Sequence, residues 1–288
     1  MTPNQPKTIQ IFLPTGDPTV IRIAEQTTSI MRVIEVPRRD LPDFLTMDES
    51  KYVGLYFLVG GENKTDVYVG QSSEVGRRLM QHHQSDEKDW ERALILISLT
   101  QNLTQTHVLY LEYLSIEKAK ACHRVKLING NNGQRPYVPI PLQADCEQIH
   151  NIGALLLATL GYPFFEPLLK KEGQSSQDSN SFFVCPRNGV DARAIYTNEG
   201  MVVLKDSNFP YMSKDRVNPH RFVFIKKCDD LIEQGILRRD GERCFFTQDY
   251  LFSSPSSAAG LLILNNVNGW KEFKTLSGTT LRDYQENN

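Results

Sequence analysis

The segments YVGLYFLVG (52–60) and DVYVG (66–70) decide the fold predicted for the centre of this chain. Both are apolar runs of strand length, and the polar loop GENKT (61–65) between them predicts an antiparallel hairpin. Side chains alternate between the two faces of a strand, so Tyr56 and Tyr68 can lie on the same side of neighbouring strands. The sequence therefore predicts a pair of tyrosines on one face of a sheet.

A basic helix is predicted directly after the hairpin, over SSEVGRRLMQHH (72–83). Ser72 or Ser73 is a suitable N-cap, and the helical spacing places Glu74, Arg78 and His82 along one face. Taken alone, such a stripe is typical of a solvated helix surface. The apolar segment ALILISL (93–99) that follows predicts a buried strand.

A second helix, VLYLEYLSIEKA (108–119), carries Glu112 on its apolar side. The residues one turn away are mostly apolar: Val108, Leu109, Ser115 and Ile116. Desolvating an unpaired carboxylate is costly, so Glu112 needs a cation, a metal ion or a hydrogen-bonding partner. A glutamate at the edge of the stripe that extends to a nearby lysine or arginine is an equally good interpretation.

A local basic patch follows this helix, because no acidic residue occurs between Glu117 and Asp145. Its members are Lys118, Lys120, Arg124, Lys126 and Arg135. The net charge of the 288-residue chain is −2, so a nucleic-acid site has to be a local patch of this kind. We therefore predict that Lys118, Lys120, Arg124 and Lys126 contact substrate.

Five segments are predicted from composition and pattern. Residues 1–50 are a β-rich extension that forms a small antiparallel meander, and 51–135 form the central domain. Residues 136–170 are a helical connector, and 171–180, rich in Gly, Ser and Gln, are a linker. Residues 181–288 form a separate α+β domain, with a short helix that begins at Ser254-Pro255. Scattered arginines in the extension, such as Arg38 and Arg39, are interpreted as solvated strand faces in preference to phosphate contacts.

The central residues suit phosphodiester hydrolysis, which requires an activated water, stabilisation of charge at phosphorus and help for the leaving oxygen. Glu112 is the candidate ligand of a single Mg²⁺ or Mn²⁺ ion, and Arg78 offers donors to phosphate oxygens. Tyr56 is the candidate general base, provided that Arg78 and the metal lower its pKa from about 10.

The remaining polar residues of the centre have supporting roles in this prediction. Tyr68 and His82 orient the water or the phosphate, or share the role of base. Asn129 fixes a loop or a phosphate oxygen. Arg77 lies one position off the helix face and is assigned a general phosphate contact.

The set Gly54-Leu55-Tyr56, Tyr68-Val69-Gly70, Arg78, His82, Glu112 and Asn129 resembles the motifs of the GIY-YIG nucleases. Leucine and valine stand where those motifs have isoleucine. The resemblance implies an α/β (α+β) domain with a three-stranded antiparallel sheet flanked by helices. It also implies metal-dependent cleavage at a tyrosine, arginine and glutamate site.

Both flanks carry weaker resemblances. FLPTGDPTVIRIAE (12–25) resembles the N-terminal segment of bacterial proteins of this architecture. SSPSSAAGLLILNNVNGWKEFKTLSGTTL (253–281) is similar to a C-terminal domain of unknown function, related in pattern to modules of restriction-modification proteins. This similarity implies a domain that directs the nuclease to particular DNA, and a domain that only stabilises the chain is equally compatible with it.

The resulting expectation is a metal-dependent endonuclease, with DNA favoured as substrate and a role in restriction or defence. An RNA-cleaving enzyme and a nucleic-acid-binding module with a dormant site are the alternatives, and the protein is expected to be a monomer or a homodimer. No apolar run approaches the length of a membrane span. Five cysteines without a CxxC pair, and no apolar leader, predict reduced thiols in a cytoplasmic protein.

Overall fold

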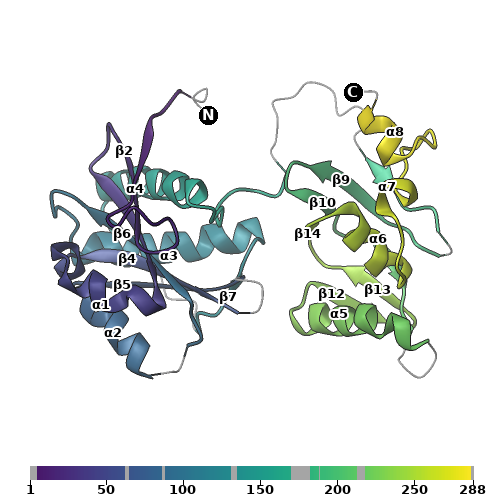
Figure 1. Cartoon of the computed structure of the whole chain (residues 1–288), viewed down its shortest axis with the longest axis horizontal. Helices are drawn as coiled ribbons and strands as arrows, with labels where there is room; N and C mark the ends of the chain where they lie inside the picture. Colours follow the sequence, from purple (N-terminus) through teal and green to yellow (C-terminus); the bar gives the residue numbers. More distant parts are fainter. Residues whose placement is uncertain are drawn as a thin grey trace. The chain divides into compact units, whose positions relative to one another are not determined.

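The computed structural model describes residues 5–61, 65–85, 88–130, 135–169, 182–187, 189–212 and 218–286. The chain divides into two compact units, Met1–Pro167 and Leu168–Asn288 (Figure 1). Each unit combines helices with sheets, so the predicted α+β fold class is confirmed. The predicted linker, 171–180, lies outside the described residues.

The N-terminal unit is built on a seven-stranded sheet of order β1-β2-β3-β6-β4-β5-β7. In this order the strands are β1 (Ile9–Phe12), β2 (Arg22–Gln26), β3 (Met31–Pro37), β6 (Arg92–Ser98), β4 (Gly54–Gly60), β5 (Asp66–Ser72) and β7 (Lys126–Leu127). The predicted meander is present as β1–β3, and β3 continues into the central strands by antiparallel pairing with β6. The expected three-stranded antiparallel sheet, β6-β4-β5, therefore forms the middle of a larger one.

Helices cover both faces of this sheet (Figure 1). On one face lie α1 (Leu41–Thr46) and α2 (Val75–Ser85), close to the short 3-10 helices η1 (Arg38–Asp40) and η2 (Asp48–Lys51). On the other face lie α3 (Gln105–Cys122) and α4 (Ile140–Thr159). The segment predicted as a connector, 136–170, thus contributes α4 to the core of the N-terminal unit.

Strand β4 separates the two cores of this unit. Leu55 and Phe57 pack in the core under α3 and α4, whereas Tyr56 and Leu58 pack in the core under α1 and α2. Every residue of β4 is buried. Burial on both faces explains why its sequence is a continuous apolar run without polar alternation.

The C-terminal unit has its own core and two sheets. One sheet has the order β14-β10-β9-β8, with β8 (Phe183–Val184), β9 (Arg193–Thr197), β10 (Gly200–Val203) and β14 (Tyr250–Phe252). The other has the order β11-β13-β12, with β11 (Asn208–Pro210), β12 (Leu237–Asp240) and β13 (Arg243–Phe246). Strands β9 and β10 pair as an antiparallel hairpin.

The helices of this unit are η5 (Pro219–Arg221), α5 (Phe222–Glu233), α6 (Pro255–Ile263), α7 (Gly269–Glu272) and α8 (Leu281–Glu286). Ser254 caps α6 as predicted, and its hydroxyl accepts a hydrogen bond from the backbone N–H of Ser257 at 3.1 Å. All five cysteines of the chain are free thiols. No helix in the described part of the chain is long and apolar enough to cross a membrane.

Candidate active site

The two tyrosines lie on the same face of the hairpin, as predicted. Tyr56 stands opposite Gly70 in the β4–β5 register, and its ring centroid is 6.3 Å from that of Tyr68. A Cβ atom on Gly70 would lie 2.4 Å from the Tyr56 Oη. Position 70 therefore requires glycine because the Tyr56 ring crosses it.

His82 joins the tyrosines from helix α2. Its Nε2 lies 2.9 Å from the Tyr56 Oη in a buried hydrogen bond, and its ring centroid is 5.5 Å from that of Tyr68. Burial lowers the pKa of His82 to about 4, and the positive charges of Lys88 and Arg78 act in the same direction. His82 is consequently neutral near pH 7.

Two opposing effects act on the pKa of Tyr56. Burial raises this pKa above its ordinary value, and the opposing effect of the hydrogen bond with Arg78 is smaller. Arg78 lowers the pKa of Tyr56, as expected, but desolvation by burial is the larger effect and raises it overall. The phenol of Tyr56 is protonated near pH 7.

Arg78 and Glu112 both act on Tyr56 by their charges. Arg78 is exposed on α2, and its Nη1 donates a hydrogen bond to Gln81 at 2.9 Å. Glu112 is half-buried on α3; burial raises its pKa and the charge of Arg78 lowers it in part. Tyr56, Arg78 and Glu112 therefore share one electrostatic environment.

The carboxylate of Glu112 is available to an incoming cation. Within the described residues it accepts no hydrogen bond and forms no ion pair, and Arg78 acts on it through its charge. Those residues also contain no group of three or more His, Cys, Asp or Glu side chains that could hold a metal ion. A cation at Glu112 would therefore have one protein carboxylate and complete its coordination with water and substrate oxygens, which Mg²⁺ accepts.

Asn129 uses both ends of its amide on the backbone of Val69. Its Oδ1 accepts from the Val69 N–H at 3.0 Å, and its Nδ2 donates to the Val69 carbonyl at 2.7 Å. These bonds hold strand β5 one residue before Gly70. Two roles were predicted for Asn129, and these hydrogen bonds correspond to the first, fixing a loop. To contact a phosphate, the Asn129 amide would have to break a hydrogen bond with Val69.

The basic residues of the predicted patch have partners within the fold, and two of the carboxylate partners are distant in sequence. Three of its lysines form ion pairs: Lys118 with Glu147 (2.7 Å), Lys120 with Glu117 (3.1 Å) and Lys126 with Asp66 (3.8 Å). Arg124 donates hydrogen bonds to the carbonyl oxygens of Glu166 and Pro167. Counting acidic residues only between positions 117 and 145 missed Glu147 and Asp66.

Arg77 is 70% exposed, and its Nε lies 3.8 Å from a carboxylate oxygen of Glu74.

Lys88 is a residue of the site that sequence reasoning missed. Its Nζ lies 4.3 Å from the centroid of the Tyr68 ring, which is a cation–π contact. Lys88 belongs to the segment between α2 and β6, outside any periodic pattern, so no signal in the sequence marked it.

The comparisons with known proteins concern the C-terminal unit. A family model described as "Domain of unknown function (DUF4357)" matches residues 183–285. The match covers the segment 253–281, for which the sequence predicted similarity to a domain of unknown function, and it covers none of residues 54–129. No curated protein and no solved structure matches the chain. The C-terminal unit thus contains a DUF4357 domain.

Proposed function

We propose that the N-terminal unit is a divalent-metal-dependent endonuclease of the GIY-YIG type, which hydrolyses phosphodiester bonds of nucleic acid, with DNA favoured. The observation that carries this proposal is the buried hydrogen bond between Tyr56 and His82, 2.9 Å long. The charges of Arg78 and Glu112 act on the same phenol. A neutral histidine, a phenol, a guanidinium and a carboxylate that forms no ion pair among the described residues supply the groups that this hydrolysis needs.

The residues fit a bound Mg²⁺ or Mn²⁺ ion at Glu112. Its carboxylate is half-buried without a partner among the described residues, and a hard cation favours such an oxygen ligand. A bound ion would stabilise negative charge on the leaving oxygen. Arg78 would bind non-bridging phosphate oxygens through its planar fork of donors.

Proton transfer in this proposal uses Tyr56 and His82 together. Because Tyr56 is protonated near pH 7, it does not act as a base alone. The neutral imidazole of His82 accepts the phenol proton at Nε2 while the Tyr56 oxygen takes a proton from the attacking water. Lys88 adds positive charge beside Tyr68 and helps to keep His82 neutral until it accepts that proton.

Plasmid cleavage tests the proposal directly. Purified protein is incubated with Mg²⁺ or Mn²⁺ and supercoiled plasmid, single-stranded DNA or RNA, with EDTA as the metal-free control. Glu112→Gln should lower the rate by about a hundredfold or more, the typical cost of losing one group that stabilises transition-state charge. Glu117→Gln is the matched control, since Glu117 lies on the same helix and is 50% exposed.

Each outcome bears on one part of the proposal. Equal activity of Glu112→Gln and wild type would remove Glu112 from the mechanism. Cleavage of RNA alone would replace DNA as substrate. Binding without cleavage under every metal condition would favour the second candidate, a nucleic-acid-binding module with a dormant site.

For the C-terminal unit we propose a role in selecting DNA, in restriction or defence. What supports it is a core separate from that of the N-terminal unit. The resemblance of 253–281 to a domain of unknown function, itself related in pattern to modules of restriction-modification proteins, points in the same direction. The full chain is offered equal amounts of unmodified plasmid and of plasmid with modified bases. Unequal rates are expected, and equal rates for every modification tested would contradict the role.

A further inference from the structure

A pocket of about 400 Å³ opens on the N-terminal unit beside the end of β3 and the start of β6. Three arginines line it, Arg38, Arg39 and Arg92, together with Thr19, Trp90 and Glu91. None of these residues belongs to the candidate active site. The lining carries three positive charges and one negative charge, which suits an anionic ligand.

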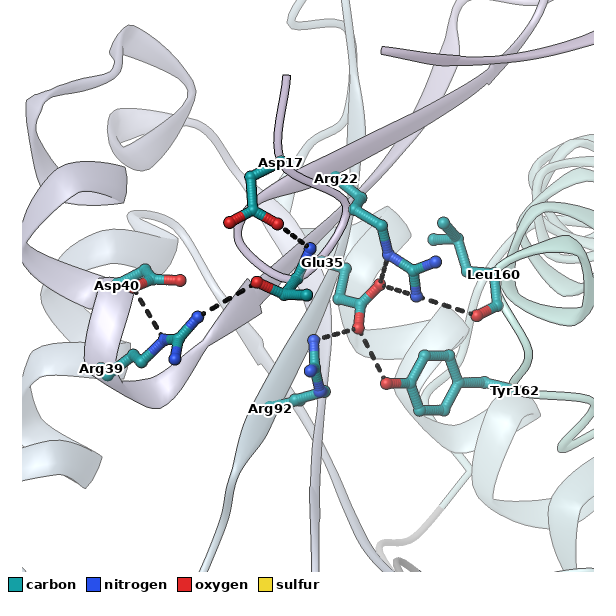
Figure 2. A network of polar contacts seen from close by, with 9 residues as sticks. Asp17, Arg22, Glu35, Arg39, Asp40, Arg92, Leu160 and Tyr162 are labelled. Carbon is teal, nitrogen blue, oxygen red and sulfur yellow. Dashed lines mark hydrogen bonds and ion pairs between the residues drawn. The ribbon is translucent and has the colours of Figure 1, made fainter. Parts of the chain in front are cut away.

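Arg92 is fixed by a carboxylate that it shares with a second arginine. Glu35 is 0% exposed and accepts hydrogen bonds from Arg92 Nη1 at 2.7 Å and from Arg22 Nε at 2.6 Å. The hydroxyl of Tyr162 donates to the same carboxylate at 2.9 Å, and Figure 2 shows the three side chains converging on Glu35. Two guanidinium groups thus share one carboxylate. Arg22, Arg92 and Glu35 together therefore carry a net charge of +1.

The guanidinium group of Arg39 is held by two neighbours, but most of the side chain remains exposed to solvent. Its Nε lies 3.3 Å from the Asp40 carboxylate (Figure 2). Its Nη2 donates to the Thr19 hydroxyl at 3.5 Å. The side chain is nevertheless 66% exposed. The loop that carries Thr19 is itself ordered by Asp17, whose carboxylate accepts from the Thr19 N–H at 2.8 Å.

Arg38 is positioned by an aromatic ring and a histidine. Its guanidinium carbon lies 5.3 Å from the centroid of the Trp90 ring, a residue that is 1% exposed. Its Nε and Nη2 donate to Nδ1 and to the carbonyl oxygen of His83, both at 3.3 Å. All three arginines of the pocket are therefore oriented before any ligand arrives.

We propose that this pocket binds a phosphate group. Guanidinium groups form charge-assisted hydrogen bonds with phosphate oxygens, and side chains that are already oriented lose little conformational entropy on binding. The acidic neighbours of the arginines serve to orient them, because Asp40 holds Arg39 and Glu35 holds Arg92. The phosphate belongs either to a free ester such as a nucleoside monophosphate or to a nucleic-acid backbone, and the site requires no catalysis by the N-terminal unit.

Isothermal titration calorimetry on the full chain tests this site, in EDTA so that cleavage plays no part. The probes are inorganic phosphate, adenosine monophosphate and a short single-stranded DNA. Arg39→Gln should raise the Kd by about tenfold, the usual effect of losing one charged hydrogen bond. Arg38→Gln should act in the same direction. The matched control is Arg282→Gln, an exposed arginine of the C-terminal unit, which should leave the Kd values for phosphate and adenosine monophosphate unchanged.

The source of the phosphate follows from which probe responds. Weaker binding of phosphate or monophosphate by Arg39→Gln identifies a free ester. If only the DNA responds, the ligand is a backbone phosphate, and the slope of log K against log salt should fall by about 0.7. Absence of binding by all three probes at millimolar concentration overturns the proposal, as do unchanged Kd values for both Arg39→Gln and Arg38→Gln. Because these binding measurements are made without metal, their outcome is independent of whether Glu112→Gln loses plasmid cleavage.

Discussion

Gly70→Ala is predicted to displace Tyr56 and so to reduce both stability and cleavage. The added Cβ would lie 2.4 Å from the Tyr56 Oη and 2.5 Å from its Cζ, roughly 1 Å inside van der Waals contact. Tyr56 is 1% exposed, so its ring has no free space in which to turn aside. Overpacking of this kind costs about 1–3 kcal/mol of unfolding free energy.

The expected loss of activity follows from the hydrogen bond between Tyr56 and His82. A shift of the hydroxyl by about 1 Å lowers the rate by about a hundredfold in a site of this type. Urea denaturation followed by circular dichroism measures the stability, and plasmid cleavage measures the rate. Gly130→Ala is the control, since a Cβ there meets no atom within 4 Å, and its stability should stay within about 0.5 kcal/mol of wild type.

A double-mutant cycle isolates the contact between positions 56 and 70. Leucine is too short to occupy the space of the tyrosine hydroxyl, so in a Tyr56→Leu background Gly70→Ala should cost less than about 0.5 kcal/mol. The coupling energy between the two positions should then be about 1–3 kcal/mol. An unaltered stability of Gly70→Ala in the wild-type background, or an equal cost in both backgrounds, would refute the placement of Tyr56 across Gly70.

Three further predictions concern stability. His150 is buried, neither of its ring nitrogens is hydrogen-bonded within the described residues, and burial lowers its pKa to about 3. As the pH falls, the histidine of the unfolded chain therefore binds a proton before the histidine of the folded chain does. Between about pH 6.5 and pH 3 this difference should lower the unfolding free energy by up to about 1.4 kcal/mol per pH unit. His150→Leu should remove that part of the slope, and urea titrations of equal steepness in both proteins would contradict this. Tyr162→Phe removes the 2.9 Å hydrogen bond to the buried Glu35 carboxylate and should cost about 1.5–3 kcal/mol in urea denaturation, so a cost below about 0.5 kcal/mol would count against the network. Ser254→Ala removes the N-cap bond to the Ser257 N–H and should cost about 1 kcal/mol by the same measurement, whereas Ser254→Asp should retain most of the stability.

Local pattern predicted the strands and helices well but not the extent of the sheet. The apolar runs around Tyr56, Tyr68 and Ile95 became β4, β5 and β6, because each run has strand length and ends at polar residues. The pairing of β3 with β6 joins residues about sixty positions apart, and no turn residue or period specifies such a contact. For the same reason local pattern does not show that β13 and β14, which are neighbours in the sequence, belong to different sheets.

Within the candidate site, sequence spacing predicted which residues lie together, but it did not predict their protonation or their ion pairs. Tyr56, Tyr68 and His82 lie together as expected, since strand and helix periods fix which face each side chain takes. The protonation of Tyr56 depends on the balance between desolvation and the charge of Arg78, which no spacing reveals. Similarly, the acidic partners of Lys118 and Lys126 come from other elements of the fold.

The two edges of the seven-stranded sheet differ in a way that matters for handling the protein. At one edge β7 and Asn129 bond to β5, whereas at the other β1 pairs with β2 alone among the described strands. Strand β1 has no charged residue, and Ile11 and Phe12 are 43% and 61% exposed. An open, uncharged edge strand is a template for intermolecular pairing. Concentrated samples should therefore aggregate through β1, and a lysine at position 11 is the substitution that would improve solubility without entering either core.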